Sequence, residues 1–114
     1  MTGDELIVSK EAFMKGGLPE EVVPVEGLGN VRIRSISRAE YMRVRTMDVD
    51  AFETAVLAAG LLEPTLSEDE VRQWRESVMA QVSDNLLGEV LRISGLRKTA
   101  VEEAKQSFPE DGGS

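Results

Sequence analysis

The sequence predicts an α+β fold, in which an N-terminal β-hairpin is followed by a mostly α-helical small domain of about five helices. Three observations lead to this prediction. Apolar and polar residues alternate over residues 21–36, serine and threonine capping boxes recur along the chain, and apolar residues follow at helical spacing after residue 50. A chain of 114 residues fits one domain. We place that domain at residues 1–108, with residues 1–8 loosely ordered and residues 109–114 as a disordered C-terminal tail.

The first expected element is a short helix over residues 9–15. Gly16 and Gly17 follow it directly, and glycine is typical of the position just past a helix end. Two apolar residues of this segment, Ala12 and Phe13, are expected to pack inward.

The hairpin is expected over residues 21–36. Val23 and Val25 alternate with polar or proline neighbours, and Val31 and Ile33 alternate with arginines. Pro24 has no N–H to give to a neighbouring strand, so its strand is expected at the edge of the sheet. Three residues between the strands tolerate the backbone of a tight turn: Gly27, Gly29 and Asn30.

Helix starts and stops are clearly marked in the second half of the chain. Capping boxes occur at Ser37–Glu40, Ser67–Glu70 and Thr99–Glu102, and Asp50 is the expected cap of a further helix. Left-handed helix ends are expected at two glycines, Gly60 and Gly95. Apolar stripes agree with these helices: Phe52, Ala55, Val56 and Ala59; Val71, Trp74, Val78 and Val82; Leu86, Leu87, Val90 and Leu91; Val101, Ala104 and Phe108.

The composition indicates a protein that acts by binding. Acid–base catalysis at neutral pH most often uses histidine, and thiolate chemistry needs cysteine, but the chain contains neither residue. Its notable acids Glu40, Glu70 and Glu102 occupy capping positions. No calcium-loop or dinucleotide-binding spacing is present. We therefore expect a non-enzyme with no catalytic, cofactor-binding or metal-binding residues.

The net charge of the chain bears on which classes of partner it can bind. The formal net charge of −8 argues against nucleic acid as a partner, because phosphates repel an acidic body. The N-terminus lacks the pattern of a signal peptide, and no apolar run is long enough to cross a bilayer. The expected location is therefore the cytoplasm, without membrane contact.

The charge balance reverses locally, where five arginines accompany a single acid, Glu40, between residues 32 and 45. Two interpretations stay open: ordinary solvated side chains, or a basic stripe that docks a partner. On the second interpretation, one partner-binding surface comprises Arg32, Arg34, Arg38, Tyr41, Met42 and Arg45.

Five sequence blocks follow one another along the chain: Val31–Arg34, Ser37–Glu40, Glu63–Val71, Leu87–Leu96 and Ala100–Ala104. In this order, the blocks resemble the tail assembly chaperones of long-tailed bacteriophages of the siphophage type. The resemblance covers roughly residues 5–108. It depends on the ordered set, because each block alone occurs in many small helical proteins.

The resemblance implies a mechanism of client binding. Such chaperones bind the tape measure protein, keep its long helical chain soluble and recruit tail tube subunits around it. They act in the cytoplasm of the bacterial host and are absent from the finished virion. Self-association is left open. A hairpin with an exposed edge would suit this work, since it can cap a sticky strand edge of a β-rich client.

Two other functions fit the same residues. A phage connector or tail-completion protein would stay in the particle, and a small acidic regulator would bind a basic protein with strong salt dependence.

Overall fold

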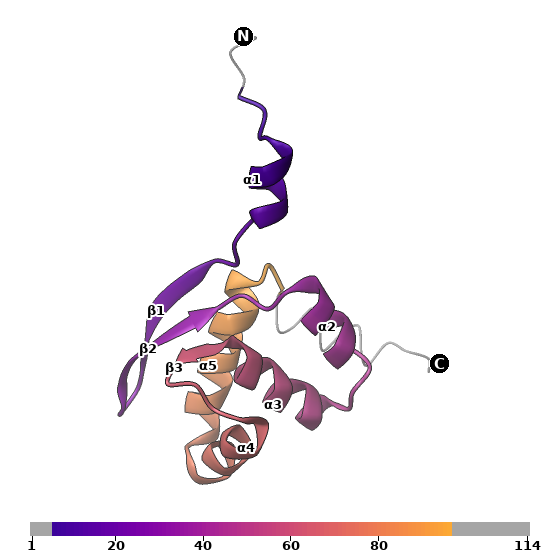
Figure 1. Cartoon of the computed structure of the whole chain (residues 1–114). Coiled ribbons are helices and arrows are strands. Elements are labelled where there is room, and N and C mark those ends of the chain that lie inside the picture. Colours follow the sequence, from indigo (N-terminus) through magenta and orange to yellow (C-terminus); the bar gives the residue numbers. More distant parts are fainter. Residues whose placement is uncertain (1–5, 97–114) are drawn as a thin grey trace, which may run out of the picture.

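The computed structural model describes residues 6–96 and confirms the α+β fold (Figure 1). The expected capping box at Thr99–Glu102, the stripe that ends at Phe108 and the expected tail lie outside the described residues. The elements in chain order are α1 (Lys10–Lys15), β1 (Glu20–Val25), β2 (Gly29–Arg34), α2 (Arg38–Val44), α3 (Val49–Gly60), β3 (Leu61–Glu63), α4 (Glu68–Ser77) and α5 (Ala80–Ile93).

The sheet has three antiparallel strands in the order β1-β2-β3. The hairpin is confirmed, with Val23 opposite Val31, and β1 is an edge strand as Pro24 indicates. Its turn is closed by the Leu28 N–H, which donates to the Val25 carbonyl oxygen at 2.9 Å. Gly27 takes a φ of 82° there, a conformation that favours glycine. The third strand, β3, was not predicted.

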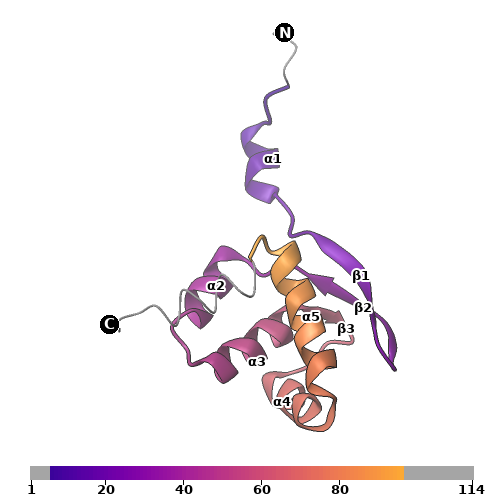
Figure 2. The same ribbon diagram turned by 180° about the vertical axis from the view of Figure 1, so that it is seen from behind.

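One face of the sheet packs on helices, and the core lies between the two layers. Figure 2 shows α5 crossing the sheet with α3 beside it. From β1 and β2, Val23 and Ile33 point into this core, whereas Val22 and Arg32 point to the other, exposed face. The predicted stripe of α5 is buried as a whole: Leu86, Leu87, Val90 and Leu91.

Two of the predicted helix starts are confirmed in atomic detail. The Ser37 Oγ accepts from the Glu40 N–H at 3.1 Å, and the Glu40 carboxylate accepts from the Ser37 N–H at 2.8 Å. Ser67 and Glu70 form the same reciprocal pair at 3.1 and 2.9 Å. Serine boxes therefore fix where α2 and α4 begin.

The cap predicted at Asp50 is wrong by two residues. The Asp48 Oδ1 accepts from the Ala51 N–H at 2.9 Å, and Asp50 lies within the first turn of α3. The earlier start lets the Phe52 N–H donate to the Asp48 carbonyl oxygen at 2.8 Å while its ring is buried. The two acids, Asp48 and Asp50, have equal capping ability, and the start at Asp48 is the one that accompanies the buried position of Phe52.

Of the two predicted left-handed helix ends, one is confirmed and the other is wrong. Gly95 has a φ of 79° after α5, which confirms it as a left-handed residue. Gly60 is instead the last helical residue of α3, and Leu61 caps that helix with a φ of −84°. A Cβ on Gly60 would lie 2.5 Å from Val90 Cγ1 of α5. Glycine is needed at residue 60 for close approach of two helices.

The short helix α1 is confirmed, but its predicted inward packing is wrong. The Ser9 Oγ caps it by accepting from the Ala12 N–H at 3.1 Å, and Gly16 ends it. Neither Ala12 nor Phe13 is buried, and the Phe13 side chain is 71% exposed. Figures 1 and 2 show α1 standing clear of the sheet and the other helices. Among the described residues, the core between the sheet and the helices α3 and α5 is formed without α1.

Candidate functional site

The most exposed apolar side chains of the described chain gather in its first segment, residues 6–18, which we call the N-terminal arm. Every residue of the arm is exposed. Leu6 is 97% exposed, a value far outside the range of a side chain that serves folding. The large apolar residues of the arm are Leu6, Ile7, Val8, Phe13, Met14 and Leu18. A monomeric protein rarely leaves such a group in water unless it serves a contact.

Four of the six predicted partner-binding residues share one face of α2. Arg38, Tyr41, Met42 and Arg45 follow the i, i+3, i+4, i+7 spacing of neighbours on a helix surface. The Arg45 guanidinium carbon lies 5.9 Å from the Tyr41 ring centroid, and its Nη1 lies 3.5 Å from the Met42 Sδ. Arg38 is exposed at the first turn and forms no ion pair within residues 6–96. We call this set the α2 face.

The other two predicted residues lie on β2 and form ion pairs within the chain. Arg34 makes a bidentate pair with Glu40, at 3.0 Å to Oε1 and 2.7 Å to Oε2. The hydrogen bond from Arg34 lowers the pKa of Glu40 to about 2, with help from the Ser37 N–H. Arg32 donates to Glu63 of β3 at 3.0 Å. Arg34 therefore fastens α2 to the sheet, and reversing its charge would test stability as well as binding.

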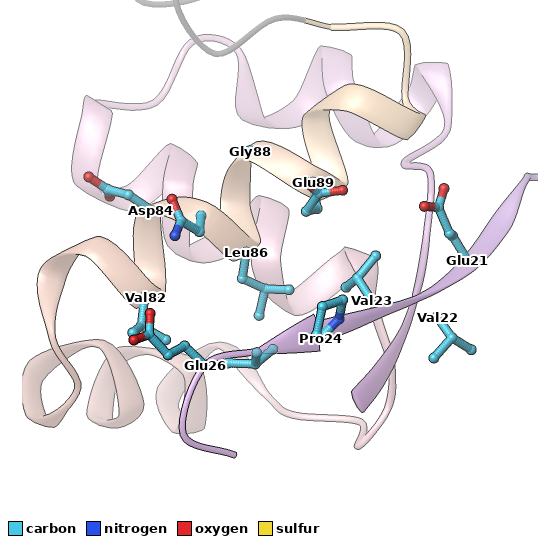
Figure 3. A pocket seen from close by; sticks show the side chains of 12 residues that line it. Glu21, Val22, Val23, Pro24, Glu26, Val82, Asp84, Leu86, Gly88 and Glu89 are labelled. Carbon is cyan, nitrogen blue, oxygen red and sulfur yellow. The ribbon is translucent and has the colours of Figure 1, made fainter. Parts of the chain in front are cut away.

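A groove of about 690 Å³ lies between β1 and the first half of α5 (Figure 3). Val23, Val25, Val82 and Leu86 provide its apolar part. Four carboxylates surround this apolar part: Glu21, Glu26, Asp84 and Glu89. No lysine or arginine of the described residues lines the groove. The groove has no signature in the sequence, because its two walls are about sixty residues apart in the chain and no local pattern links them.

Arg75 of α4 forms the most elaborate polar cluster of the described residues. It donates to Thr54 Oγ1 at 2.7 Å, to Glu53 at 2.7 Å and to Ser83 Oγ at 3.3 Å. The Arg75 side chain is 16% exposed and that of Glu53 12% exposed. A nearby hollow of about 210 Å³ is lined by both signs of charge. This cluster joins α3, α4 and α5 and has a structural role.

Two further properties of the described residues bear on a site. Within residues 6–96, no three acidic side chains come together as a metal site would require. No helix in that span is long and apolar enough to cross a membrane. Comparisons with protein-family models, with curated proteins and with solved structures found no match.

Proposed function

We propose that this protein is a non-catalytic assembly chaperone of phage tails. In this proposal it binds the tape measure protein and recruits tail tube subunits in the cytoplasm of the bacterial host. The observation that carries the proposal is the N-terminal arm, with its large apolar side chains held in water beyond a closed core. The block-by-block resemblance supplies the identity of the clients.

The arm suits a client with a long apolar stripe. A tape measure chain that is helical over its length exposes such a stripe before the tube forms around it. Leu6, Phe13 and Met14 offer side chains of different shape, and methionine adapts to varied surfaces. Within the arm, Gly16 and Gly17 lie between α1 and the sheet, which gives α1 freedom of direction.

The body of the protein suits the solubilising part of the work. Its net charge of −8 opposes association of loaded complexes with one another. The α2 face is the second client surface in this proposal, with Arg38 as its exposed cation and Tyr41 and Met42 as its apolar part. The two surfaces allow one client to be held while another is recruited.

The proposal is tested by co-expression of the tagged chain with the tape measure and tail tube proteins of its own genome. We expect a soluble complex, and aggregation of the clients when the chaperone is left out. If the tagged chain retains neither client, the proposal is wrong. Proteomics of purified virions then separates it from a connector, because a chaperone is missing from the finished particle.

Substitutions in the arm make the test specific. A chain carrying Leu6→Ser, Ile7→Ser, Phe13→Ser and Met14→Ser should fold normally and release the tape measure protein. Met79→Ser is the matched control, because Met79 is 66% exposed but lies on the body between α4 and α5. Equal client solubility with both variants would contradict a role for the arm.

A further inference from the structure

The groove between β1 and α5 lies along the free edge of the sheet. Consecutive residues of β1, Glu21 to Val25, line one wall of it. Because β1 is the edge strand of the sheet, this wall ends at an unpaired strand edge. No strand among the described residues pairs with β1 on that side.

The hydrogen-bond pattern shows which backbone groups of β1 are left unpaired at the edge of the sheet. The Ser35 N–H donates to the Pro19 carbonyl oxygen at 2.9 Å, so this pair occupies a hydrogen-bonded position of the ladder, with a single bond because proline has no N–H. Antiparallel pairs alternate between bonded and non-bonded. With Glu20 opposite Arg34 and Val22 opposite Arg32, the N–H and C=O groups of Glu20 and Val22 point away from β2. Pro24 adds one further carbonyl oxygen.

The four carboxylates of the groove, which we call the acidic rim, favour an occupant that carries positive charge. Arg92 pairs with Glu21 at 2.8 Å and with Glu89 at 2.7 Å, so it offsets one of the four carboxylates. The lining holds four carboxylates and no lysine or arginine of the described residues, and Figure 3 shows Glu26 and Asp84 near one end with Glu21 and Glu89 near the other. Lysine or arginine at both ends of a bound segment would meet opposite charge.

We propose that this groove binds an extended basic segment of another protein, which adds to the free edge of β1 as a fourth strand. Backbone hydrogen bonds to Glu20 and Val22 would hold the segment, and its apolar side chains would lie beside the exposed Val22 and Pro24. Its cationic side chains would lie against the acidic rim.

A second copy of this chain is a poor occupant by comparison. Its exposed apolar segment from Leu6 to Val8 follows directly on Asp4 and Glu5, and Lys10 is the single cation in the first ten residues. Those two acids would meet the acidic rim. The inference does not depend on the proposed function, because it concerns a different surface from the N-terminal arm and the α2 face.

The probe for this site is a fluorescent peptide of alternating chemistry, Lys-Val-Lys-Val-Lys-Val-Lys, added to the full ¹⁵N-labelled chain. We expect amide shift changes concentrated in β1 and the first half of α5, and affinity that falls as salt is added. The peptide Glu-Val-Glu-Val-Glu-Val-Glu should not bind. Equal binding of both peptides, or shift changes confined to the arm, would overturn the proposal.

Three variants test the strand edge, the groove and the acidic rim separately. Val22→Pro removes one edge N–H in the register where Pro24 already stands, and we expect binding about two- to tenfold weaker. Gly88→Leu should block the groove, because a Cβ at Gly88 meets no atom within 4 Å and the larger side chain extends into it. Glu26→Lys tests the rim.

The matched control for charge is Glu76→Lys on α4, which makes the same change outside the groove and should bind as the natural chain does. The arm variant described above should also bind the peptide normally. Loss of peptide binding in the arm variant would overturn the groove assignment, whereas loss of client capture alone would bear only on the arm. Unchanged binding by Gly88→Leu, with the fold verified by its spectrum, would likewise overturn it.

Discussion

Gly60 and Gly88 lie in neighbouring helices, but a methyl group has opposite consequences at the two positions. At Gly60 the added Cβ would meet Val90 Cγ1 at 2.5 Å and the Arg34 carbonyl oxygen at 3.3 Å. At Gly88 it would meet open space. The sequence predicted a left-handed helix end at Gly60 and not a close helix approach, because the distance between two helices cannot be read from one of them.

We expect Gly60→Ala to lower the free energy of unfolding by about 1–3 kcal/mol, the range of overpacking in a closed core. Gly88→Ala should raise it by about 0.5–1 kcal/mol, because alanine restricts the unfolded chain and favours a helix. Urea unfolding of both variants measures the difference. Combining Gly60→Ala with Val90→Ala should recover part of the loss. Equal stability of the two single variants would contradict the close helix approach.

The Arg34–Glu40 pair makes a residue-scale prediction about pH. The pKa of Glu40 is held at about 2 in the folded chain, below its ordinary value of 4.5. The pair therefore contributes stability above the ordinary pKa, and that contribution is lost as pH falls from about 4.5 towards about 2. Glu40→Gln keeps the capping bond to the Ser37 N–H but removes the ion pair.

We expect Glu40→Gln to be less stable than the natural chain at neutral pH, with a difference that shrinks through this acid range. Urea midpoints of both proteins as a function of pH provide the measurement. Glu76→Gln is the control, because Glu76 is exposed and forms no ion pair within residues 6–96. A Glu40→Gln difference that stays constant down to the lowest pH would show that the Arg34 pair is not its origin.

At the scale of elements, the sequence predicted what local chemistry decides. Serine capping boxes, the alternation in the hairpin and the stripe of α5 all act within a few residues, and the structure confirms them. The sequence did not predict β3, because three residues cannot show an alternating pattern. Leu61 becomes part of a strand by pairing with Ile33, about thirty residues earlier. The sequence also could not show whether α1 packs on the core, because that depends on the position of the other elements.

Arg75 joins three helices, and its replacement makes the element-scale prediction. Arg75→Met keeps much of the apolar stem but leaves Glu53 and Thr54 without their guanidinium donors. We expect a loss of about 2–3 kcal/mol in unfolding free energy, in line with hydrogen bonds to charged groups. Arg72→Met is the matched control, because Arg72 pairs with Asp69 on the surface and should change stability by less than about 1 kcal/mol.

Adding Glu53→Gln to Arg75→Met should restore part of the stability, since it removes a carboxylate left in a half-closed site. If the two arginine variants lose equal stability in urea, the three-helix junction is not a significant source of stability.

At the scale of the whole molecule, the chain divides into a closed body and an exposed arm. The sequence predicted a single helical domain with a hairpin, and it located the arginines of the α2 face. It could not predict the arm as a surface, because apolar residues such as Phe13 are equally typical of a core position. Nor could it find the groove, which exists only where β1 and α5 meet.

This division leads to a prediction for hydrogen exchange. A six-residue helix without buried side chains has little to hold its backbone bonds closed, so the amides of Ala12–Gly16 should exchange far faster than those of α5. In a soluble complex with the tape measure protein, we expect the arm to become protected while the body changes little. Mass spectrometry of peptides covering residues 6–18 measures both states. Protection of the arm in the free chain would mean that its apolar side chains are already engaged, and the arm would then not be the surface that receives a client.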